Sequence, residues 1–383
     1  MLSSTIILTV NAGSSSVRLS AFDAEDNELQ PLTSEHLDAD SGEPEELLRT
    51  FLDAHSLKNL AAVSHRIVHG GARFTAPTRL DAAAEREIGQ LSHLAPLHNP
   101  RALRWIKACR AVLSDATLQI GVFDTAFYAQ LPVVAATYAL PGELCRKYGI
   151  RRFGFHGLAH GAMLQRWRQL RPEVEDGGRV ISLQLGSGCS ITATARGLPQ
   201  DTSMGFSPLE GLVMATRCGD VDAGLLAFLQ REENLTPDAL ELLLNTKSGL
   251  LGVSEQSGDM RVLLESDDSR AKLAPEAQLA VELFCYRARK YIGAYLTVLG
   301  GADAVLFGGG VGENAAPIRE RILSGLEWCG LTLDRAANDS AKGREARISA
   351  PGSRIEAWIV PVDEAKVLAQ EAVALLPPSS STR

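Results

Sequence analysis

Three clusters of small residues stand where apolar stretches end, and each could hold negatively charged oxygens. They are 11-NAGSSS-16, 186-GSGCS-190 and 307-FGGGVGEN-314. Backbone N–H groups and hydroxyls in such turns suit phosphate. One glycine-rich turn would be weak evidence, because tight connections commonly use glycine. Three of them, two of which repeat one design, favour a phosphate-binding protein.

Four polar or cationic side chains lie in settings where a small anion could approach. Arg66 and Arg217 stand among apolar residues near glycine, and a planar guanidinium can bind a carboxylate or phosphate through two hydrogen bonds. His156 precedes a glycine and could donate a hydrogen bond to a developing oxyanion. His98 lies in a proline-containing turn and could equally tie that turn to the backbone.

Two carboxylates come just after apolar stretches that we expect to be strands. They are Asp124, after 121-GVF-123, and Glu364, after 358-WIVPV-362. Ligands and catalytic groups of α/β proteins gather at the carboxyl ends of strands. Carboxylates near a phosphate site usually hold Mg²⁺. Asp124 and Glu364 are therefore candidates for catalysis and metal binding.

Other kinds of site fit the sequence less well. The chain has no GxxxxGK[ST] phosphate loop and no HRD or DFG pair of a protein kinase. The cluster at 307–314 lies late in the chain and lacks the downstream βαβ unit of a dinucleotide-binding fold. The pairs His65/His69 and His156/His160 suggest a metallohydrolase, but neither matches HExxH and no third ligand stands out. That function stays a minor alternative.

Size and composition indicate a soluble protein of two domains. The 383 residues exceed one ordinary core. A net charge of −8 argues against a nucleic-acid partner, although it allows a local cationic pocket. The start lacks the features of a signal peptide, and no apolar run reaches the length of a membrane span. The six cysteines form no CxxC pair, which favours reduced thiols in the cytoplasm.

The elements that must position these groups repeat one plan. Residues 6–23 and 180–197 each give an apolar strand, a small polar turn and a second strand. This repetition predicts two β-hairpins and two similar halves, each mixing strands with helices, in an α/β protein with a cleft. Residues 147–157 interrupt the periodic pattern, so the boundary between the halves is expected near 146–152.

Helix signals are clear in the second half. Thr236 and Pro237 predict the start of a helix that ends at Gly249. A longer helix is expected over 275–299, followed by a short buried strand over 302–307. The expected surface segments are 171–178, 336–354 and the tail 377–383.

Seven segments of the chain, in this order, resemble the acetate kinase family of acyl-phosphate-forming kinases. They are 11-NAGSSS-16, 64-SHRIVHGG-71, 94-LAPLHNP-100, 122-VFDTAF-127, 151-RRFGFHG-157, 201-DTSMGFSPLEGLVMATRCGD-220 and 307-FGGGVGEN-314. The resemblance implies the fold shared by actin, hexokinase and sugar kinases: two duplicated actin-like ATPase (ribonuclease H-like) domains with an interdomain cleft. The N-terminal domain would be 1–149, completed by a C-terminal helix at 366–383, and the second domain, with most of the nucleotide site, 150–365.

The resemblance also implies the activity, which is reversible, Mg²⁺-ATP-dependent phosphorylation of acetate to acetyl phosphate by direct transfer. The alternatives are a propionate or butyrate kinase and a nucleotide-binding relative without turnover. A cytoplasmic homodimer is expected. The catalytic residues would be Arg66, His98, Asp124, His156 and Arg217. Arg66, Val68, Leu97, Phe155 and Pro208 would bind the acid. Asn11 and Glu364 would hold the metal. The nucleotide and its phosphates would meet Asn11, Ser14, Ser16, Arg18, Gln184, Gly186, Ser187, Gly188, Gly310 and Asn314.

Three segments depart from the family pattern. Arg18 replaces the usual lysine, and Asp363-Glu364-Ala365 replaces Asn-Glu-Glu. In the loop 184-QLGSG-188, Gln184 and Ser187 replace the usual histidine and asparagine. Both can donate hydrogen bonds, but they cannot supply a cationic imidazole or the longer reach of asparagine. Nucleotide affinity and the preferred phosphoryl donor are the properties that Gln184 and Ser187 are expected to affect.

Overall fold

The protein divides into two compact units. A computed structural model describes residues 5–13, 16–25, 28–38, 41–268 and 274–377. The first unit comprises Met1–Ala129, Phe155–Leu158 and Asp363–Arg383, and the second comprises Gln130–Gly154 and Ala159–Val362. Compact units need not coincide with domains, so the division between residues 149 and 150 stays a prediction.

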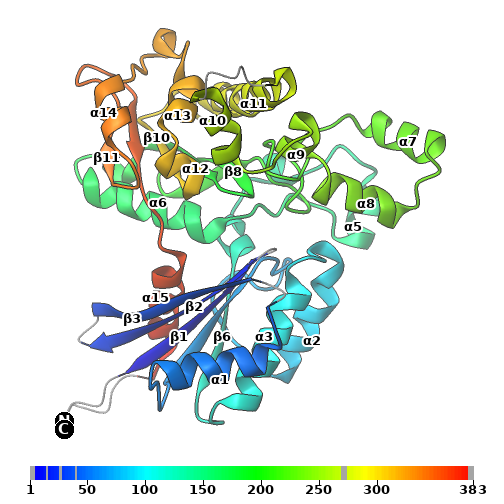
Figure 1. The fold of residues 1–383 in the computed structure, drawn as a ribbon, viewed down its shortest axis with the longest axis vertical. Helices are drawn as coiled ribbons and strands as arrows, with labels where there is room; N and C mark the ends of the chain where they lie inside the picture. Colours follow the sequence, from blue (N-terminus) through cyan, green and yellow to red (C-terminus); the bar gives the residue numbers. More distant parts are fainter. Residues whose placement is uncertain (1–4, 14–15, 26–27, 39–40, 269–273, 378–383) are drawn as a thin grey trace. The chain divides into compact units, whose positions relative to one another are not determined.

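The first unit is built on a six-stranded sheet with the order β3-β2-β1-β4-β6-β5 (Figure 1). Its strands are β1 (Ile6–Ala12), β2 (Ser16–Glu25), β3 (Glu28–Asp38), β4 (Ala62–Ile67), β5 (Thr78–Arg79) and β6 (Leu118–Phe123). The first three form an antiparallel meander, β1, β4 and β6 run parallel, and β5 is antiparallel to β6. Successive side chains of a strand point to opposite faces. Both Ile7 and Leu8 are buried, so β1 is covered on both sides.

The second unit repeats this topology strand for strand. Its sheet has the order β11-β12-β10-β7-β8-β9. The strands are β7 (Arg179–Leu185), β8 (Cys189–Ala195), β9 (Leu198–Thr202), β10 (Ala304–Gly308), β11 (Ala346–Arg347) and β12 (Glu356–Ile359). Again three strands form an antiparallel meander, three run parallel, and a two-residue strand closes the edge antiparallel to its neighbour. The duplication predicted from the two hairpins is confirmed.

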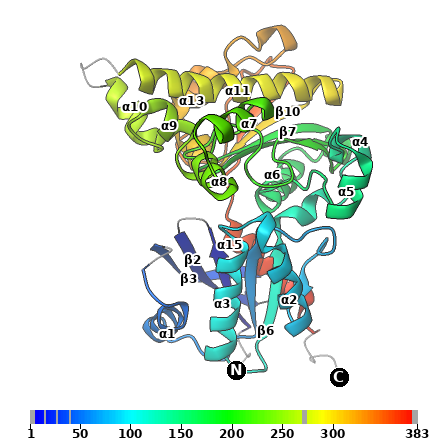
Figure 2. The ribbon, with the colours of Figure 1, turned by 90° about the vertical axis from the view of Figure 1, so that its right-hand side faces the viewer.

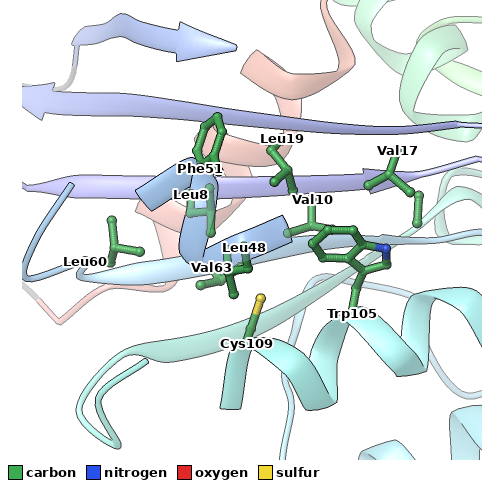
Figure 3. Close-up of a cluster of buried hydrophobic side chains, with 11 residues drawn as sticks. Leu8, Val10, Val17, Leu19, Leu48, Phe51, Leu60, Val63, Trp105 and Cys109 are labelled. Carbon is green, nitrogen blue, oxygen red and sulfur yellow. The ribbon is translucent and has the colours of Figure 1, made fainter. Parts of the chain in front are cut away.

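Helices cover both faces of the first sheet. They are α1 (Pro44–Ala54), α2 (Ala82–Gln90), α3 (Asn99–Val112) and α15 (Glu364–Leu375). On one face Leu8 and Val10 of β1 pack with Phe51 of α1 and Trp105 of α3 (Figure 3). On the other face α15 packs against β1 and β6, with Leu368 fully buried. The last helix therefore belongs to the core of the N-terminal sheet. It was predicted over 366–383, but it begins at Glu364 and ends at Leu375.

The second unit carries most of the remaining helices. They are α4 (Val133–Ala136), α5 (Gly142–Tyr148), α6 (Gly157–Leu170, whose first two residues belong to the first unit), α7 (Ala223–Glu232), α8 (Pro237–Thr246), α9 (Gly249–Ser254), α10 (Met260–Asp268), α11 (Pro275–Leu299), α12 (Gly309–Asn314), α13 (Ala316–Leu323) and α14 (Arg335–Ser340). Helices α6 and α11 lie on opposite faces of the sheet (Figure 2). Short 3₁₀ helices are η1 (Leu91–Leu94), η2 (Asp124–Tyr128), η3 (Glu175–Gly177) and η4 (Glu327–Cys329).

Local signals placed several elements well. Thr236 caps the start of α8 by accepting a hydrogen bond from the backbone N–H of Ala239, but α8 ends at Thr246 rather than at Gly249, which begins α9. Helix α11 ends at Leu299 and is capped by Gly300 in the left-handed conformation. The strand expected over 302–307 is β10, shifted to 304–308. The loop expected over 336–354 is wrong in part, because α14 and β11 lie in it. The segment 171–178 contains η3, and most of the tail, 378–383, lies outside the described residues.

None of the helices in the described part of the chain combines the length and apolar character that crossing a lipid bilayer requires. All six cysteines fall within that part and carry free thiols. Four of them are buried, and burial raises the pKa of the Cys189 thiol to about 12. These four thiols are small core side chains.

Candidate active site

Four polar side chains of the first unit meet where three parallel strands end. Asn11 lies at the end of β1, Arg66 near the end of β4 and Asp124 directly after β6. Because β1, β4 and β6 are parallel neighbours, their carboxyl ends lie at one edge of the sheet. Glu364 comes to this edge as the first residue of α15. We call Asn11, Arg66, Asp124 and Glu364 the Arg66 cluster.

Arg66 is the hub of this cluster. Its Nε and NH2 donate to Oδ2 of Asp124 at 3.2 and 2.7 Å. Its NH1 donates to Oε2 of Glu364 at 3.2 Å and to Oδ1 of Asn11 at 3.1 Å. Nδ2 of Asn11 donates to the same Glu364 oxygen at 2.6 Å. The guanidinium is thereby held in one plane by three residues that are distant in sequence.

The charges of the Arg66 cluster do not balance. One guanidinium faces two carboxylates, and Oδ1 of Asp124 is buried without a hydrogen-bond partner among the described residues. Burial opposes the charge of Arg66, but Asp124 and Glu364 outweigh this effect and raise its pKa. Burial raises the pKa of Asp124, although Arg66 acts in the opposite direction. Surplus negative charge and hard oxygen donors are the properties of a site for a divalent cation such as Mg²⁺.

The segment that carries His156 is fastened to Asp124 by a close backbone approach. His156 has a φ of 58°, in the left-handed region that side chains other than glycine rarely adopt. A Cβ at Gly157 would overlap the carbonyl oxygen of Asp124, so only glycine fits there. Tyr128 donates to the carbonyl of Phe155 at 3.0 Å. Backbone strain of this kind is often found at functional sites.

The other predicted residues of the first unit occupy varied positions. Ser14 lies outside the described residues, and Ser16 begins β2. Arg18 stands opposite Asn11 in the β1–β2 ladder, but its guanidinium contacts Ser34 and Asp363.

The predicted acyl-pocket residues of this unit differ in burial. Val68 and Phe155 are buried, with the Phe155 ring against His69, whereas Leu97 is 42% exposed. His98 is buried and directly precedes α3.

A cavity of ≈ 770 Å³ lies within the second unit. Four of the predicted nucleotide-binding residues line it: Gly186, Ser187, Gly310 and Asn314. The first two stand in the β7–β8 turn, and the last two in α12, where Asn314 donates to the carbonyl of Gly310 at 2.9 Å. Gly188 closes the same turn by accepting from Gly186 at 3.1 Å. Gln184 is half-buried at the end of β7, and its Oε1 has no partner within the described structure.

Arg217 lies in the loop between β9 and α7, next to two residues that line this cavity. Ala215 and Thr216 are part of the cavity wall, and the N–H of Ala215 donates to the carbonyl of Ser187 at 3.0 Å. Arg217 is 8% exposed, and its NH1 donates to the carbonyl of Pro208 at 2.6 Å. A main-chain hydrogen bond thus joins the β7–β8 turn to the loop that carries Arg217.

Sequence reasoning missed part of the cavity wall. Its other lining residues include Gly258, Asp259, Met260, Arg261, Leu264 and Lys342. Asp259 and Arg261 form an ion pair at 2.6 Å at the start of α10. The only sequence signal for this segment is a Ser-Gly-Asp turn before an apolar helix, which is typical of any helix start.

Among the described residues, neither histidine pair belongs to a group of metal ligands. His65 and His69 lie on and after a strand, so their spacing places them on no common helix face. His65 contacts Oε1 of Gln119 at 2.7 Å, and His160 lies between the hydroxyls of Ser182 and Ser190 at 2.7 Å each. Burial lowers the pKa of His65 to about 4 and that of His160 to about 3. In the described ranges no three His, Cys, Asp or Glu side chains are grouped as metal ligands.

Comparison with known proteins gives one consistent result. The sequence model of the Acetokinase family matches residues 44–370. The chain is 46% identical to the acetate kinase of Solibacter usitatus (strain Ellin6076) over 325 residues, which is 84% of this chain and 77% of that protein. It is 41% identical to the acetate kinase of Methanosarcina acetivorans over 332 residues, 85% of this chain and 80% of its relative.

Solved structures agree. The fold superposes on that of Porphyromonas gingivalis acetate kinase with a TM-score of 0.87 and 33% identity, covering 97% of this chain and all of the other. A propionate kinase from Francisella tularensis matches with a TM-score of 0.86 and 32% identity, covering 96% and 98% of the two chains. The α/β fold with two duplicated sheets is therefore the fold of these kinases.

Proposed function

Because this chain belongs to the acetokinase family, we propose that it catalyses the reversible transfer of the γ-phosphoryl group of ATP to acetate, which forms acetyl phosphate. The observation that carries this proposal is the Arg66 cluster. A guanidinium held in one plane beside surplus carboxylate charge can grip the acid and the phosphoryl group. The duplicated sheets, with a cavity beside the glycine turns of the second unit, support ATP as the donor.

The proposed reaction needs no covalent enzyme intermediate. A carboxylate oxygen of acetate attacks the γ-phosphorus in line, the new O–P bond forms, and the bond to the bridging oxygen of ADP breaks. Acetate is already ionised at neutral pH, so no proton must be removed from it. His156 is therefore assigned as a hydrogen-bond donor to the phosphoryl oxygens, together with Arg66 and Arg217.

The Arg66 cluster fits a magnesium ion. Glu364 and Asn11 are assigned as the residues that hold it, and the buried, partnerless Oδ1 of Asp124 adds negative charge beside it. When bound, Mg²⁺ supplies charge neutralisation to phosphate oxygens. Asp124 itself orients Arg66 through two hydrogen bonds, and this is its proposed catalytic contribution.

The remaining assignments follow the family. Val68, Leu97, Phe155 and Pro208 are proposed to receive the methyl group of the acid, with His98 also at the active site. The adenosine part of ATP is assigned to the cavity, where Met260 and Leu264 offer apolar contact to a base.

We also propose a cytoplasmic homodimer whose domains are 1–149, completed by the C-terminal helix, and 150–365. Light scattering at micromolar concentration should give about twice the monomer mass of 41.0 kDa.

A hydroxylamine assay tests the function directly. Protein, Mg-ATP, acetate and hydroxylamine should give acetyl hydroxamate, and reactions without ATP or without acetate should give none. If ATP binds but no short acid yields product, the chain is a nucleotide-binding relative without turnover. Activity only with added Zn²⁺ and a hydrolysable ester or amide would support the metallohydrolase instead.

Acetate is not the only acid to test, since the chain matches a propionate kinase almost as well as an acetate kinase. One methylene in an apolar pocket changes discrimination by about 1–3 kcal/mol. A panel of acetate, propionate and butyrate, crossed with ATP, GTP and pyrophosphate, measures both preferences by kcat/KM. A higher value for propionate than for acetate would reassign the substrate within the proposed chemistry.

Ser187→Asn is expected to lower the Kd for ATP by roughly tenfold. Ser187 is exposed at the cavity wall, so the longer amide has room and could donate one more hydrogen bond to a phosphate oxygen. Such bonds to charged groups contribute about 1.5–3 kcal/mol. Isothermal titration calorimetry measures the change. Ser187→Ala is the control and should bind ATP no tighter than the unsubstituted protein; equal affinity of all three proteins would show that position 187 does not contact the phosphates.

A further inference from the structure

Three side chains of the second unit meet, and one of them, Glu210, belongs to the loop that carries Pro208 and Arg217. The Tyr138 hydroxyl donates to Oε2 of Glu210, and NH2 of Arg152 donates to Oε1 of Glu210 at 2.5 Å. The Arg152 guanidinium lies over the Tyr138 ring, 5.3 Å from its centroid. We call Tyr138, Arg152 and Glu210 the Glu210 triad. Both oxygens of this carboxylate are therefore engaged.

The Glu210 triad also holds the start of the loop. NH1 of Arg152 donates to the carbonyls of Thr202 and Ser203, each at 3.2 Å. The Tyr138 hydroxyl accepts the backbone N–H of Phe206 at 2.9 Å. Burial raises the pKa of Tyr138 above its ordinary value, so this hydroxyl keeps its proton and can donate to Glu210. The triad thus ties both ends of the stretch 202–210.

Gly205 shows how tightly this stretch is folded. A Cβ at this position would overlap both Oε2 of Glu210 and the Tyr138 hydroxyl. The side chain of Glu210 therefore lies directly against the backbone at the start of the loop. Pro208 lies between Gly205 and Glu210 in the sequence, and its carbonyl accepts the 2.6 Å hydrogen bond from NH1 of Arg217.

We propose that Glu210 is a positioning residue for phosphoryl transfer: with Tyr138 and Arg152 it fixes the Pro208 carbonyl that orients the Arg217 guanidinium. This inference rests on the proposed function, in which Arg217 meets the phosphoryl group. A displacement of about 1 Å at such a group can cost on the order of 10²-fold in rate. The triad itself need not touch either substrate.

Glu210→Ala is expected to lower kcat/KM for acetate by about 10–100-fold, with the Kd for ATP within about twofold of the unsubstituted protein. Glu210→Gln should recover part of this loss, because its amide oxygen still accepts one of the two bonds. Tyr138→Phe keeps the packing and removes one donor, so a smaller loss is expected; it serves as the second variant if Glu210→Ala folds poorly. Glu345→Ala is the matched control, since it breaks the exposed, two-bond pair with Arg166 in the same unit.

Two further measurements separate positioning from a general structural role. In an Arg217→Lys background, Glu210→Ala should lower kcat/KM for acetate by less than about threefold, because the proposed effect of Glu210 depends on the Arg217 guanidinium. Modification of Arg217 by phenylglyoxal, followed by mass spectrometry, should be faster in Glu210→Ala and unchanged in Glu345→Ala. An equal kinetic cost in both backgrounds, or an unchanged modification rate, overturns the proposal. If the unsubstituted protein forms no hydroxamate, the proposed function is overturned instead. The rate of Arg217 modification still tests whether Glu210 positions the guanidinium.

Discussion

Arg217→Ala should abolish nearly all acyl-phosphate formation, with a fall in kcat of about 10²–10³. The guanidinium stands beside the cavity wall and is held by the Pro208 carbonyl. It is already oriented before substrate binds, so no energy is spent on orienting it during the reaction. Arg217 itself does not line the cavity. ATP binding should therefore persist, and calorimetry with ATP measures this alongside the hydroxamate assay.

The matched control for this change is Arg231→Ala. Arg231 lies in the last turn of α7, exposed and in the same unit, and its removal should leave kcat within about twofold. If Arg217→Ala folds, binds ATP and retains turnover within a few fold, Arg217 does not stabilise the transition state. The assignment of Arg217 to catalysis would then be wrong.

Arg66→Ala should lose both activity and stability. Its removal leaves Asp124 and Glu364 as two neighbouring carboxylates without a cation, and breaking a buried pair in this way costs about 3–5 kcal/mol in the free energy of unfolding. The rate of acyl-phosphate formation should also fall by about 10²–10³, because the variant lacks the guanidinium proposed to donate hydrogen bonds to the phosphoryl group and to the acid. Urea unfolding and the hydroxamate assay measure the two effects separately.

The stability of Arg66→Ala should also depend on pH. Burial raises the pKa of Asp124 in the folded protein, and Arg66 normally counteracts this shift. Without Arg66 the folded state binds a proton more readily than the unfolded state does, so stability should decline as pH rises through the window between the two pKa values. The free energy of unfolding should therefore differ more between pH 5 and pH 8 for the variant than for the unsubstituted protein.

Two variants make the Arg66 result interpretable. Arg66→Lys keeps the positive charge but loses the planar fork, so most of the stability should return while the rate stays low. Arg104→Ala breaks the exposed pair with Glu43 in the same unit and should change stability by less than about 1 kcal/mol. Stability of Arg66→Ala equal to that of the unsubstituted protein at pH 8 would contradict the buried-pair interpretation.

Local patterns sufficed for much of the architecture. The repeated strand, turn and strand at 6–23 and 180–197 predicts both hairpins, because alternation and small polar turns act over a few residues. Thr236 followed by Pro237 marks the start of α8 for the same reason. The stretch 336–354 shows the limit of such patterns. There Asn338 of α14 is buried against Arg319 of α13, and a polar sequence gives no sign of that contact.

The sequence by itself determined the residue types of the candidate site and the ends of the elements on which they stand, since glycine turns and apolar runs are local features. Only the tertiary structure decided that Asn11, Arg66, Asp124 and Glu364 share hydrogen bonds. These residues are separated by as many as 353 positions, and they meet because parallel pairing of β1, β4 and β6 brings three strand ends to one edge. Sheet order and side-chain orientation depend on how much apolar surface the whole unit buries, and this total cannot be calculated from any short segment of the sequence.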